Sequence, residues 1–210
     1  MRISATERRV QLTEATIQLM RRDGVQSVTL RAIAEEAKAS LATVHYCFTD
    51  KDELLRAAID RWLKDMVAHA ADAPTDEGLR GAVLGLAHRY WDALEDTPVD
   101  VLAQLELVIW AVRNDASNPL APLIYPGYKV ELGALFAQAM TNAQETCSMG
   151  IEALVRAFLV IIDGCSLQFL TQPTLSDHRE LCFWMMQALL DNAGIDSAAR
   201  TGAAASAAIS

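Results

Sequence analysis

The chain has 210 residues, of which 52% are hydrophobic and 21% are charged. This length leaves room for one large domain or two small ones, and the composition is typical of a globular protein rather than a disordered one. The net charge of −9 argues against an extended nucleic-acid-binding surface, but the charge is uneven. Residues 1–48 hold seven Lys and Arg against five Asp and Glu, so a mildly basic N-terminal region precedes an acidic remainder, which is compatible with a small DNA-contact surface.

Several protein classes are disfavoured by simple patterns. The four cysteines are far apart and form no C-x-x-C pair, which predicts reduced, mostly buried thiols in a cytoplasmic protein. No apolar run follows the basic residues at the N-terminus, so we expect no signal peptide. The most apolar stretch, 151–170, contains Glu152, Arg156 and Asp163, which argues against a membrane-spanning helix.

Apolar residues recur every three or four positions along the chain, which predicts an all-α protein without strands. Capping residues, glycines and prolines set the helix ends, and we expect Thr29 and Ser40 to cap the two short helices that follow them. Residues 118–126, with three prolines, are expected to be the loosest internal stretch, and the Ala-, Ser- and Gly-rich residues 195–210 a disordered tail. The expected helices span residues 6–22, 30–37, 41–48, about 50–71, 77–95, 98–114, 148–171 and 176–192. A further expected helix begins after the proline-rich stretch and ends at about residue 144.

The most specific pattern lies between residues 29 and 55. Two short predicted helices are joined there by three residues, which is the geometry of a helix-turn-helix. At about 100° per residue, Leu41, Val44 and Phe48 share one face of the second helix, and we expect this face to pack inward.

The opposite face of this second helix presents small, polar and aromatic side chains. Ala42, Thr43 and Tyr46 point outward and His45 lies at the border, which suits close contact with a DNA groove. The helix N-terminus also offers backbone N–H groups to phosphate. The alternative is an ordinary helical hairpin whose exposed face has no function.

The order of residues in this stretch resembles the N-terminal domain of the TetR (tetracycline-repressor) family of bacterial transcriptional regulators. That family shows T-[LVM]-x-x-I-A-x-x-A, then S-x-x-[ST]-[LV]-Y/H-Y-x-F, then K-x-x-L, and here these segments are 29–37, 40–48 and Lys51 with Leu54. The chain departs from the family at two positions. Lys38 stands in the turn where the family usually has Gly, and Cys47 stands where it usually has His or Tyr.

The resemblance implies a DNA-binding regulator, most simply a repressor, that binds a roughly palindromic operator as a homodimer. It implies phosphate contacts for Thr29, Tyr46 and Lys51. Lys38 and Lys51 are alternatively solvated lysines, and His45 is alternatively a half-buried packing residue. The full set of expected DNA contacts is Thr29, Arg31, Lys38, Ser40, Ala42, Thr43, His45, Tyr46 and Lys51.

We therefore expect a DNA-binding domain at 1–50 and a helical effector-binding and dimerisation domain at 51–194, in which 51–71 is a connecting helix. The last two helices are apolar nearly all round, so each needs cover on two sides, and a second copy of the chain is the simplest second cover. A central helix inside a monomer core is the alternative. The expected interface residues are Phe158, Ile162, Trp184, Met185 and Leu189.

Helical domains place ligands between helices, in apolar pockets with a few polar groups. By the resemblance, we expect a small, mostly apolar effector that favours a dimer whose recognition helices are wrongly spaced for DNA. Each candidate lining residue is individually more typical of core packing. The candidates are Tyr90, Trp91, Gln104, Glu106, Trp110, Arg113, Tyr125, Tyr128, Phe136, Gln168 and Phe169.

No other chemistry stands out. The four histidines are far apart, and Walker and G-x-S-x-G motifs are absent, so we expect no metal site, cofactor or catalytic centre. Asp163-Gly164-Cys165 could supply a thiol nucleophile, but a cysteine in an apolar helix usually acts as a small buried hydrophobe. The second function that remains open is a helical small-molecule-binding or interaction protein whose helix-turn-helix is vestigial.

Overall fold

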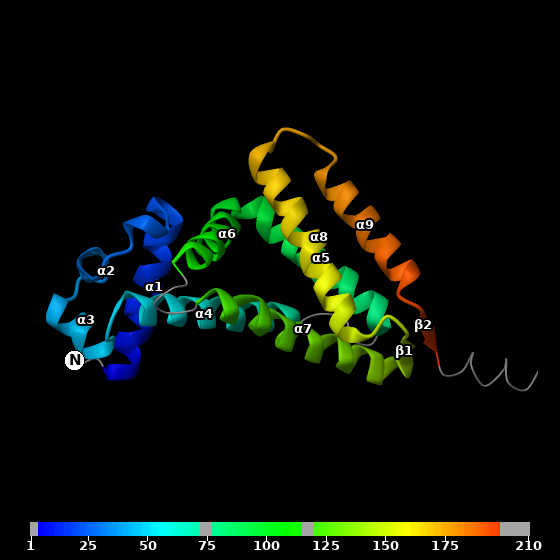
Figure 1. Ribbon diagram of the computed structural model, residues 1–210, viewed down its shortest axis with the longest axis horizontal. Helices are drawn as coiled ribbons and strands as arrows, with labels where there is room; N and C mark the ends of the chain where they lie inside the picture. Colours follow the sequence, from blue (N-terminus) through cyan, green and yellow to red (C-terminus); the bar gives the residue numbers. More distant parts are fainter. Residues whose placement is uncertain (1–3, 72–76, 115–119, 198–210) are drawn as a thin grey trace, which may run out of the picture. The chain divides into compact units, whose positions relative to one another are not determined.

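The computed structural model describes residues 4–71, 77–114 and 120–197, with the side chains of 66–71 and 197 excepted, and this part of the chain is almost entirely helical (Figure 1). The all-α class predicted from the sequence is confirmed. Most helix bounds agree with the prediction to within three residues. The elements are α1 (Ala5–Asp23), the 3₁₀ helix η1 (Val25–Ser27), α2 (Leu30–Glu36), α3 (Leu41–Cys47), α4 (Lys51–Ala71), α5 (Gly78–Asp96), α6 (Pro98–Arg113), α7 (Ala121–Ala143), β1 (Glu145–Cys147), α8 (Ile151–Thr171), α9 (His178–Asn192) and β2 (Ile195–Ser197).

The first three α-helices each begin at a residue whose side chain caps the helix N-terminus. Ser4 and Glu7 form a capping box at α1, in which each side chain accepts a hydrogen bond from the other residue's backbone N–H. Thr29 caps α2 and Ser40 caps α3, each accepting from the backbone N–H three residues later, at 3.1 Å. Both caps were expected from the sequence, and both are confirmed.

The start of α7 corrects the expectation for the proline-rich stretch. Residues 121–126 are helical, and Pro126 lies inside α7. Pro122 falls in the first turn, where the backbone N–H groups have no helical partner, so it removes no hydrogen bond. Pro126 removes a single one, and the rest of this long helix tolerates that loss. Residues 115–119 lie outside the described part of the chain.

Two short strands were missed by the sequence analysis. β1 pairs with β2 in antiparallel register, with Glu145 opposite Ser197 and Cys147 opposite Ile195. A three-residue strand is too short to show an alternating pattern, and its partner lies fifty positions away. The prediction that the tail begins at 195 is therefore wrong for 195–197, and residues 198–210 lie outside the described part.

The chain divides into two compact units, Met1–Asp65 with Thr97–Gly127 and Met66–Asp96 with Tyr128–Ser210. α6 belongs to the first unit, together with α1, η1, α2 and α3, whereas the sequence placed it in the effector domain. α4 and α7 contribute residues to both units. A compact unit and a functional domain need not end at the same residue, so the functional boundary at 50 stays a prediction.

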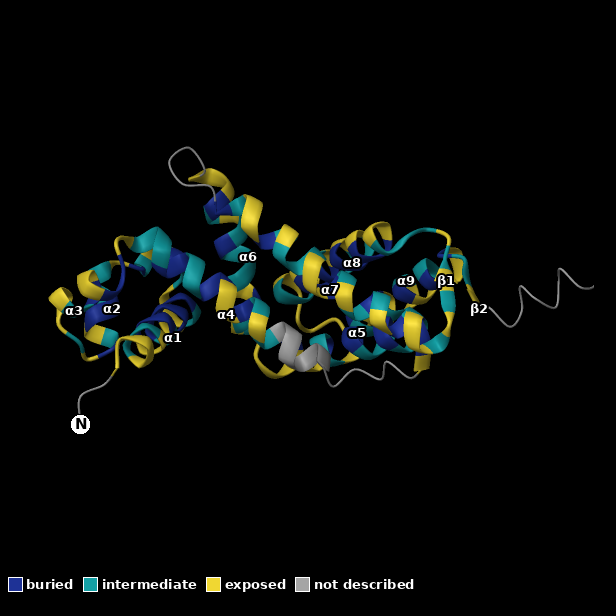
Figure 2. Ribbon diagram, turned by 90° about the horizontal axis from the view of Figure 1, so that it is seen from below, coloured by how far each residue is buried: buried dark blue, intermediate teal, exposed yellow. Residues whose placement is uncertain are grey.

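The core of the second unit is apolar and aromatic. α5 buries Trp91, α7 buries Phe136 and α8 buries Phe158, whose ring lies edge-on to Phe136 with the centroids 5.8 Å apart. Figure 2 shows these buried faces alternating with exposed ones along each helix. Among the described helices, α8 is long and apolar enough to cross a membrane by length and composition, but one face packs within the unit, as in the core helix of a globular protein.

Candidate functional site

The turn between α2 and α3 closes without glycine. Lys38 has a φ of 50°, in the left-handed region where the family usually has Gly. Its backbone N–H donates to the Glu35 carbonyl at 3.1 Å, and Ala39 donates to the Ala34 carbonyl at 2.9 Å. A side chain in this conformation costs about 1–2 kcal/mol, which the surrounding packing must offset.

Two of the three residues predicted to face inward on α3 do so. Val44 and Phe48 are fully buried, whereas Leu41 is 39% exposed. The prediction for Leu41 is wrong because it is the first residue of the helix. Helical side chains lean toward the N-terminus, and no helical turn precedes Leu41 to receive its side chain.

The outer surface of α3 follows the prediction. Tyr46 is 81% exposed, Ala42 and His45 are exposed, and Thr43 is half-buried with its hydroxyl 2.8 Å from that of Ser40. Thr29, Arg31, Lys38 and Ser40 are exposed as well. α2, α3 and the residues that flank them thus present one set of exposed or half-buried small, polar and aromatic side chains, which we call the reading surface. It comprises Thr29, Arg31, Lys38, Ser40, Ala42, Thr43, His45 and Tyr46.

Lys51 differs from the other expected DNA contacts. Its ammonium donates to the Val25 carbonyl at 3.3 Å and lies 4.9 Å from the centre of the Trp110 ring. Burial lowers the pKa of Lys51, against a smaller opposite effect of the neighbouring Asp52 charge. The side chain is therefore engaged inside the first unit in this structure.

Two further contacts join α6 to the end of α1 and to η1. The Glu106 carboxylate accepts a hydrogen bond from the Val25 backbone N–H at 3.2 Å, and Arg21 forms an ion pair with Asp100 at 2.6 Å. Gly24, with a φ of 79°, lies so close that a Cβ there would sit 3.0 Å from the Glu106 oxygens. We call the three contacts Arg21–Asp100, Val25–Glu106 and Lys51–Trp110 the α6 latch.

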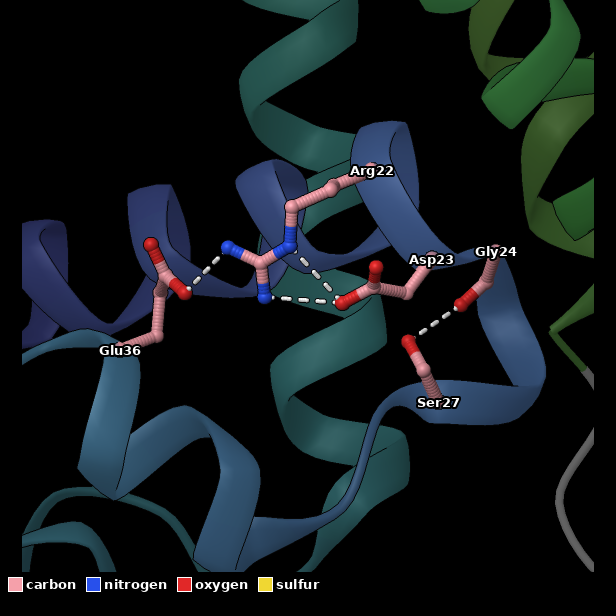
Figure 3. A network of polar contacts seen from close by, with 5 residues as sticks. All are labelled: Arg22, Asp23, Gly24, Ser27 and Glu36. Carbon is pink, nitrogen blue, oxygen red and sulfur yellow. Dashed lines mark hydrogen bonds and ion pairs between the residues drawn. The ribbon is translucent and has the colours of Figure 1, made fainter.

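Further arginines hold the short helices in place. Arg22, at the end of α1, binds its neighbour Asp23 and reaches Glu36 at the end of α2 at 2.8 Å (Figure 3). In the same view, the Ser27 hydroxyl donates to the Gly24 carbonyl at 2.7 Å.

Arg9 connects α3 to α4. It donates to the Cys47 carbonyl, pairs with Glu53 at 2.8 Å and lies over the Phe48 ring. No sequence motif marks Arg9 or Arg22, and the partners through which they hold the other helices, Glu36, Cys47 and Glu53, lie 14 to 44 positions away, so neither arginine was predicted as a site residue.

The expected effector-lining residues do not fall in a single unit. Gln104, Glu106, Trp110, Arg113 and Tyr125 belong to the first unit, where Glu106 and Trp110 take part in the α6 latch. The remaining candidates belong to the second unit. Within it Trp91 and Phe136 are fully buried, Tyr90, Tyr128 and Phe169 are half-buried, and Gln168 is exposed.

A small polar cluster lies inside the second unit. The Ser166 hydroxyl donates to the Ile162 carbonyl at 2.7 Å and lies 2.8 Å from the Tyr90 hydroxyl. Because Ser166 has one proton and donates it to Ile162, Tyr90 must be the donor of the second bond. Burial raises the pKa of Tyr90, and the negative charge of Asp163 raises it further. Burial and the same charge raise the pKa of Tyr128 to about 12.

The two cysteines of α8 and α9 are packed against each other. Cys165 and Cys182 are buried free thiols, and the hydrogen bond between them, with burial, raises the pKa of Cys182. This placement fits the small buried hydrophobe expected from the sequence. Within the described residues, no three His, Cys, Asp or Glu side chains gather in a way that could hold a metal ion.

The expected dimer residues divide between two faces of α8 and α9. Phe158 and Ile162 are each 3% exposed, so they pack inside their own unit and offer almost no surface to a second copy. Met185 and Leu189 are half-buried, and Trp184 is 65% exposed. The exposed large apolar side chains of the two helices form what we call the outer face, namely Val160, Leu167, Leu181 and Trp184.

Comparison with known proteins agrees with these features. Residues 12–58 match the family model described as bacterial regulatory proteins, tetR family. The chain is 40% identical over 202 residues to the HTH-type nicotine-responsive transcriptional repressor HdnoR of Paenarthrobacter nicotinovorans. This match covers 93% of this chain and all of HdnoR.

Solved structures share the fold. The multidrug binding protein EbrR complexed with ethidium matches with a TM-score of 0.68 and 25% identity, over 87% of this chain and 98% of that one. A TetR transcription regulator from Haloarcula marismortui matches with a TM-score of 0.69 and 22% identity, over 91% and 100%. The resemblance found in residues 29–54 is thereby confirmed: this chain belongs to the tetR family of bacterial regulatory proteins and is a ligand-responsive, DNA-binding transcriptional regulator.

Proposed function

We propose that the protein represses transcription by binding a roughly palindromic operator near its own gene as a homodimer, and that a small, mostly apolar effector releases it. The reading surface is the observation that carries the DNA-binding part. It places hydroxyl groups, basic side chains and an exposed tyrosine on two short helices whose N-terminal caps are in place. Such groups position a recognition helix on phosphates while small side chains approach base edges.

All residues of the reading surface remain proposed DNA contacts. Lys51 has a second role in this proposal, because its ammonium is engaged by the Val25 carbonyl and the Trp110 ring. For Lys51 to reach a phosphate, the α6 latch must loosen at this point. The latch holds the end of α1, η1 and the start of α4 against α6, and we propose that the effector shifts this element, since allostery requires an element with two arrangements.

We infer that the outer face of α8 and α9 forms the dimer interface. Four large apolar side chains there are exposed in the single chain, and two antiparallel helices present them together. A second copy related by two-fold symmetry would cover them with the same residues, as in an isologous four-helix interface. The proposed interface thus keeps Trp184, with Met185 and Leu189 at its edge, and replaces Phe158 and Ile162 by Val160 and Leu167.

The test is binding to the intergenic DNA upstream of the protein's own gene, measured by fluorescence anisotropy at several salt concentrations. We expect affinity to fall steeply with salt, because most contacts are to phosphate. Tyr46→Ala should weaken binding to all sequences by about tenfold, and Thr43→Ala should weaken the operator more than unrelated DNA. Val130→Ala, an exposed apolar change on α7, is the matched control. Absence of salt-sensitive binding, with or without effector, would favour the helical ligand-binding protein with a vestigial helix-turn-helix.

A further inference from the structure

Arg89, on α5, has a guanidinium group whose inner edge lacks an acceptor. The side chain is half-buried, and its Nε and Nη2 atoms are buried with no hydrogen-bond partner among the described residues. An N–H group that neither water nor protein accepts is unfavourable, and more so when it belongs to a charged group. A buried donor of this kind needs an explanation, and no sequence motif marks Arg89.

The neighbours of Arg89 along α5 do not supply the acceptor. Side chains three and four positions apart on a helix can meet, and for Arg89 these are Gly85, Leu86, Asp92 and Ala93. Among them only Asp92 carries a charge, and Arg179 of α9 forms an ion pair with it at 2.6 Å. The one carboxylate at a suitable spacing on α5 is therefore engaged by another arginine.

The other described cations of the second unit differ from Arg89. Three of them have carboxylate partners, and the fourth, Arg156, is exposed to water. The three ion pairs are Arg80–Asp191 at 2.7 Å, Arg179–Asp92 at 2.6 Å and Lys129–Glu152 at 3.9 Å. Arg89 alone among them combines buried nitrogen atoms with the lack of an acceptor for those atoms.

Two sides of α5 are already occupied by contacts with neighbouring helices. The Tyr90 hydroxyl lies 2.8 Å from that of Ser166 on α8, and the His88 ring stacks on Phe183 of α9 with the centroids 4.0 Å apart. At about 100° per residue, Arg89 lies between these two directions and on neither of them. Its guanidinium is thus separate from the contacts that fix α5 against α8 and α9.

The covalent geometry of the guanidinium defines what the two buried atoms can bind. The N–H bonds of Nε and Nη2 point the same way along one edge of the planar group. Two parallel donors of this kind match the two oxygens of a carboxylate, and the resulting bidentate pair is stronger than a single neutral hydrogen bond. A lone hydroxyl or carbonyl oxygen matches this edge less well, because it offers one acceptor atom to two donors.

We propose that the Nε–Nη2 edge of Arg89 binds a carboxylate of the effector, which is then a small organic acid with an apolar body. This assignment rests on the proposed function and names the chemical class of its effector. Because the edge is buried in the arrangement of the unit described above, an acid reaches it only in a second arrangement that opens it. A ligand that prefers one of two arrangements shifts the equilibrium between them, which is what an effector requires.

The experiment is calorimetric titration of the full-length protein with benzoate and with benzamide, which has the same ring but no charge, at constant ionic strength. Wild-type protein should bind benzoate at least about tenfold more tightly than benzamide. Arg89→Lys keeps the charge but lacks the two parallel donors, so it should weaken benzoate by about tenfold while changing benzamide by less than about twofold. The matched control is Arg156→Lys, at an exposed arginine of α8, which should behave as wild type.

A second variant tests the unpaired edge without any ligand. Arg89→Met replaces the guanidinium by an apolar side chain that keeps much of the packing. It should unfold at a urea concentration no lower than that of wild type, because it removes buried N–H groups that have no acceptor. A clear loss of stability would show that the edge already has a partner within the protein, and the proposed site would then be wrong.

Operator binding, measured on the same preparations, separates this inference from the proposed function. Benzoate should weaken operator binding by wild-type protein and have less effect on Arg89→Lys; benzoate that binds at Arg89 without this effect contradicts the effector assignment. A protein that binds operator DNA but binds benzoate no better than benzamide overturns the carboxylate site and leaves the regulator intact. A protein that binds no operator overturns the proposed function instead. Equal benzoate affinity in wild type and folded Arg89→Lys contradicts the role of Arg89 directly.

Discussion

In the first unit, charged side chains reach across to backbone groups at the ends of neighbouring helices, as Arg9 does at Cys47 and Glu106 does at Val25. In the second unit, exposed ion pairs such as Arg80–Asp191 join α5 to α9, and the core is built from buried aromatic and aliphatic side chains. Short helices bury too little apolar area to fix their own orientation, so they need directional polar contacts. The long helices of the second unit bury large apolar faces, so packing supplies most of what fixes their orientation, and ion pairs such as Arg179–Asp92 add to it.

The largest expected effect on stability distinguishes the buried face of α8 from the outer face of α8 and α9. Phe158→Arg places a charge in the core of the second unit, and we expect a loss of more than about 4 kcal/mol in the free energy of unfolding, which would leave little folded protein. Trp184→Arg changes the outer face, and we expect a folded monomer. Urea unfolding and sedimentation velocity at micromolar concentration distinguish the two results.

Val130→Arg is the matched control for Trp184→Arg, because Val130 is equally exposed but lies on α7. It should leave the dimer unchanged. A dimeric Trp184→Arg protein together with a monomeric Val130→Arg protein would place the interface on α7 and contradict the proposed outer face.

The next largest effect concerns the polar contacts of the first unit. Glu106→Ala leaves the N–H of the buried Val25 without its acceptor, and we expect a loss of about 1–2 kcal/mol in the free energy of unfolding. Glu131→Ala, an exposed carboxylate on α7, should change this free energy by less than about 0.5 kcal/mol. If both variants unfold at the same urea concentration as wild type, the latch contributes nothing to stability.

The pH dependence above neutrality probes the polar cluster of the second unit. The pKa of Tyr128 is raised from its ordinary value of 10 to about 12, so the folded state holds a proton that the unfolded state releases in this window. The free energy of unfolding should therefore fall as pH rises from 10 toward 12, and Tyr90 acts in the same direction. Tyr128→Phe should flatten this decline in urea unfolding series at each pH. A wild-type decline that Tyr128→Phe leaves unchanged would assign it to other groups.

The smallest effect compares one strained residue in each unit. Lys38 and Gln144 both have left-handed backbone conformations, with φ of 50° and 54°. Replacing either by Gly should raise the free energy of unfolding by about 0.5–1 kcal/mol, because Gly adopts this conformation without steric cost. Lys38→Gly should also reduce operator affinity slightly if Lys38 contacts phosphate, whereas Gln144→Gly should not. Thermal melts and anisotropy on the same samples test both expectations.

Local sequence was sufficient for most of the helices, the start of α7 excepted, and for most of the outer surface of α3. Caps such as Thr29 and Ser40 bind backbone N–H groups three residues later. The spacing of apolar residues likewise repeats every three or four positions. Both signals are therefore visible in a short stretch of sequence. The outward placement of Tyr46 follows from helical geometry alone once Val44 and Phe48 are known to pack inward. The family resemblance rests on these same local residues.

Tertiary structure decided what depends on partners distant in the sequence. Nothing near Lys51 or Glu106 indicates that both side chains meet Val25, and nothing near Glu145 indicates a strand partner at Ser197. On α8, apolar residues occupy almost every position, so periodicity could not tell the buried Phe158 from the exposed Val160. Only the packing of α8 against its neighbours separates the inner face from the outer one, because burial is a property of the neighbours and not of the residue.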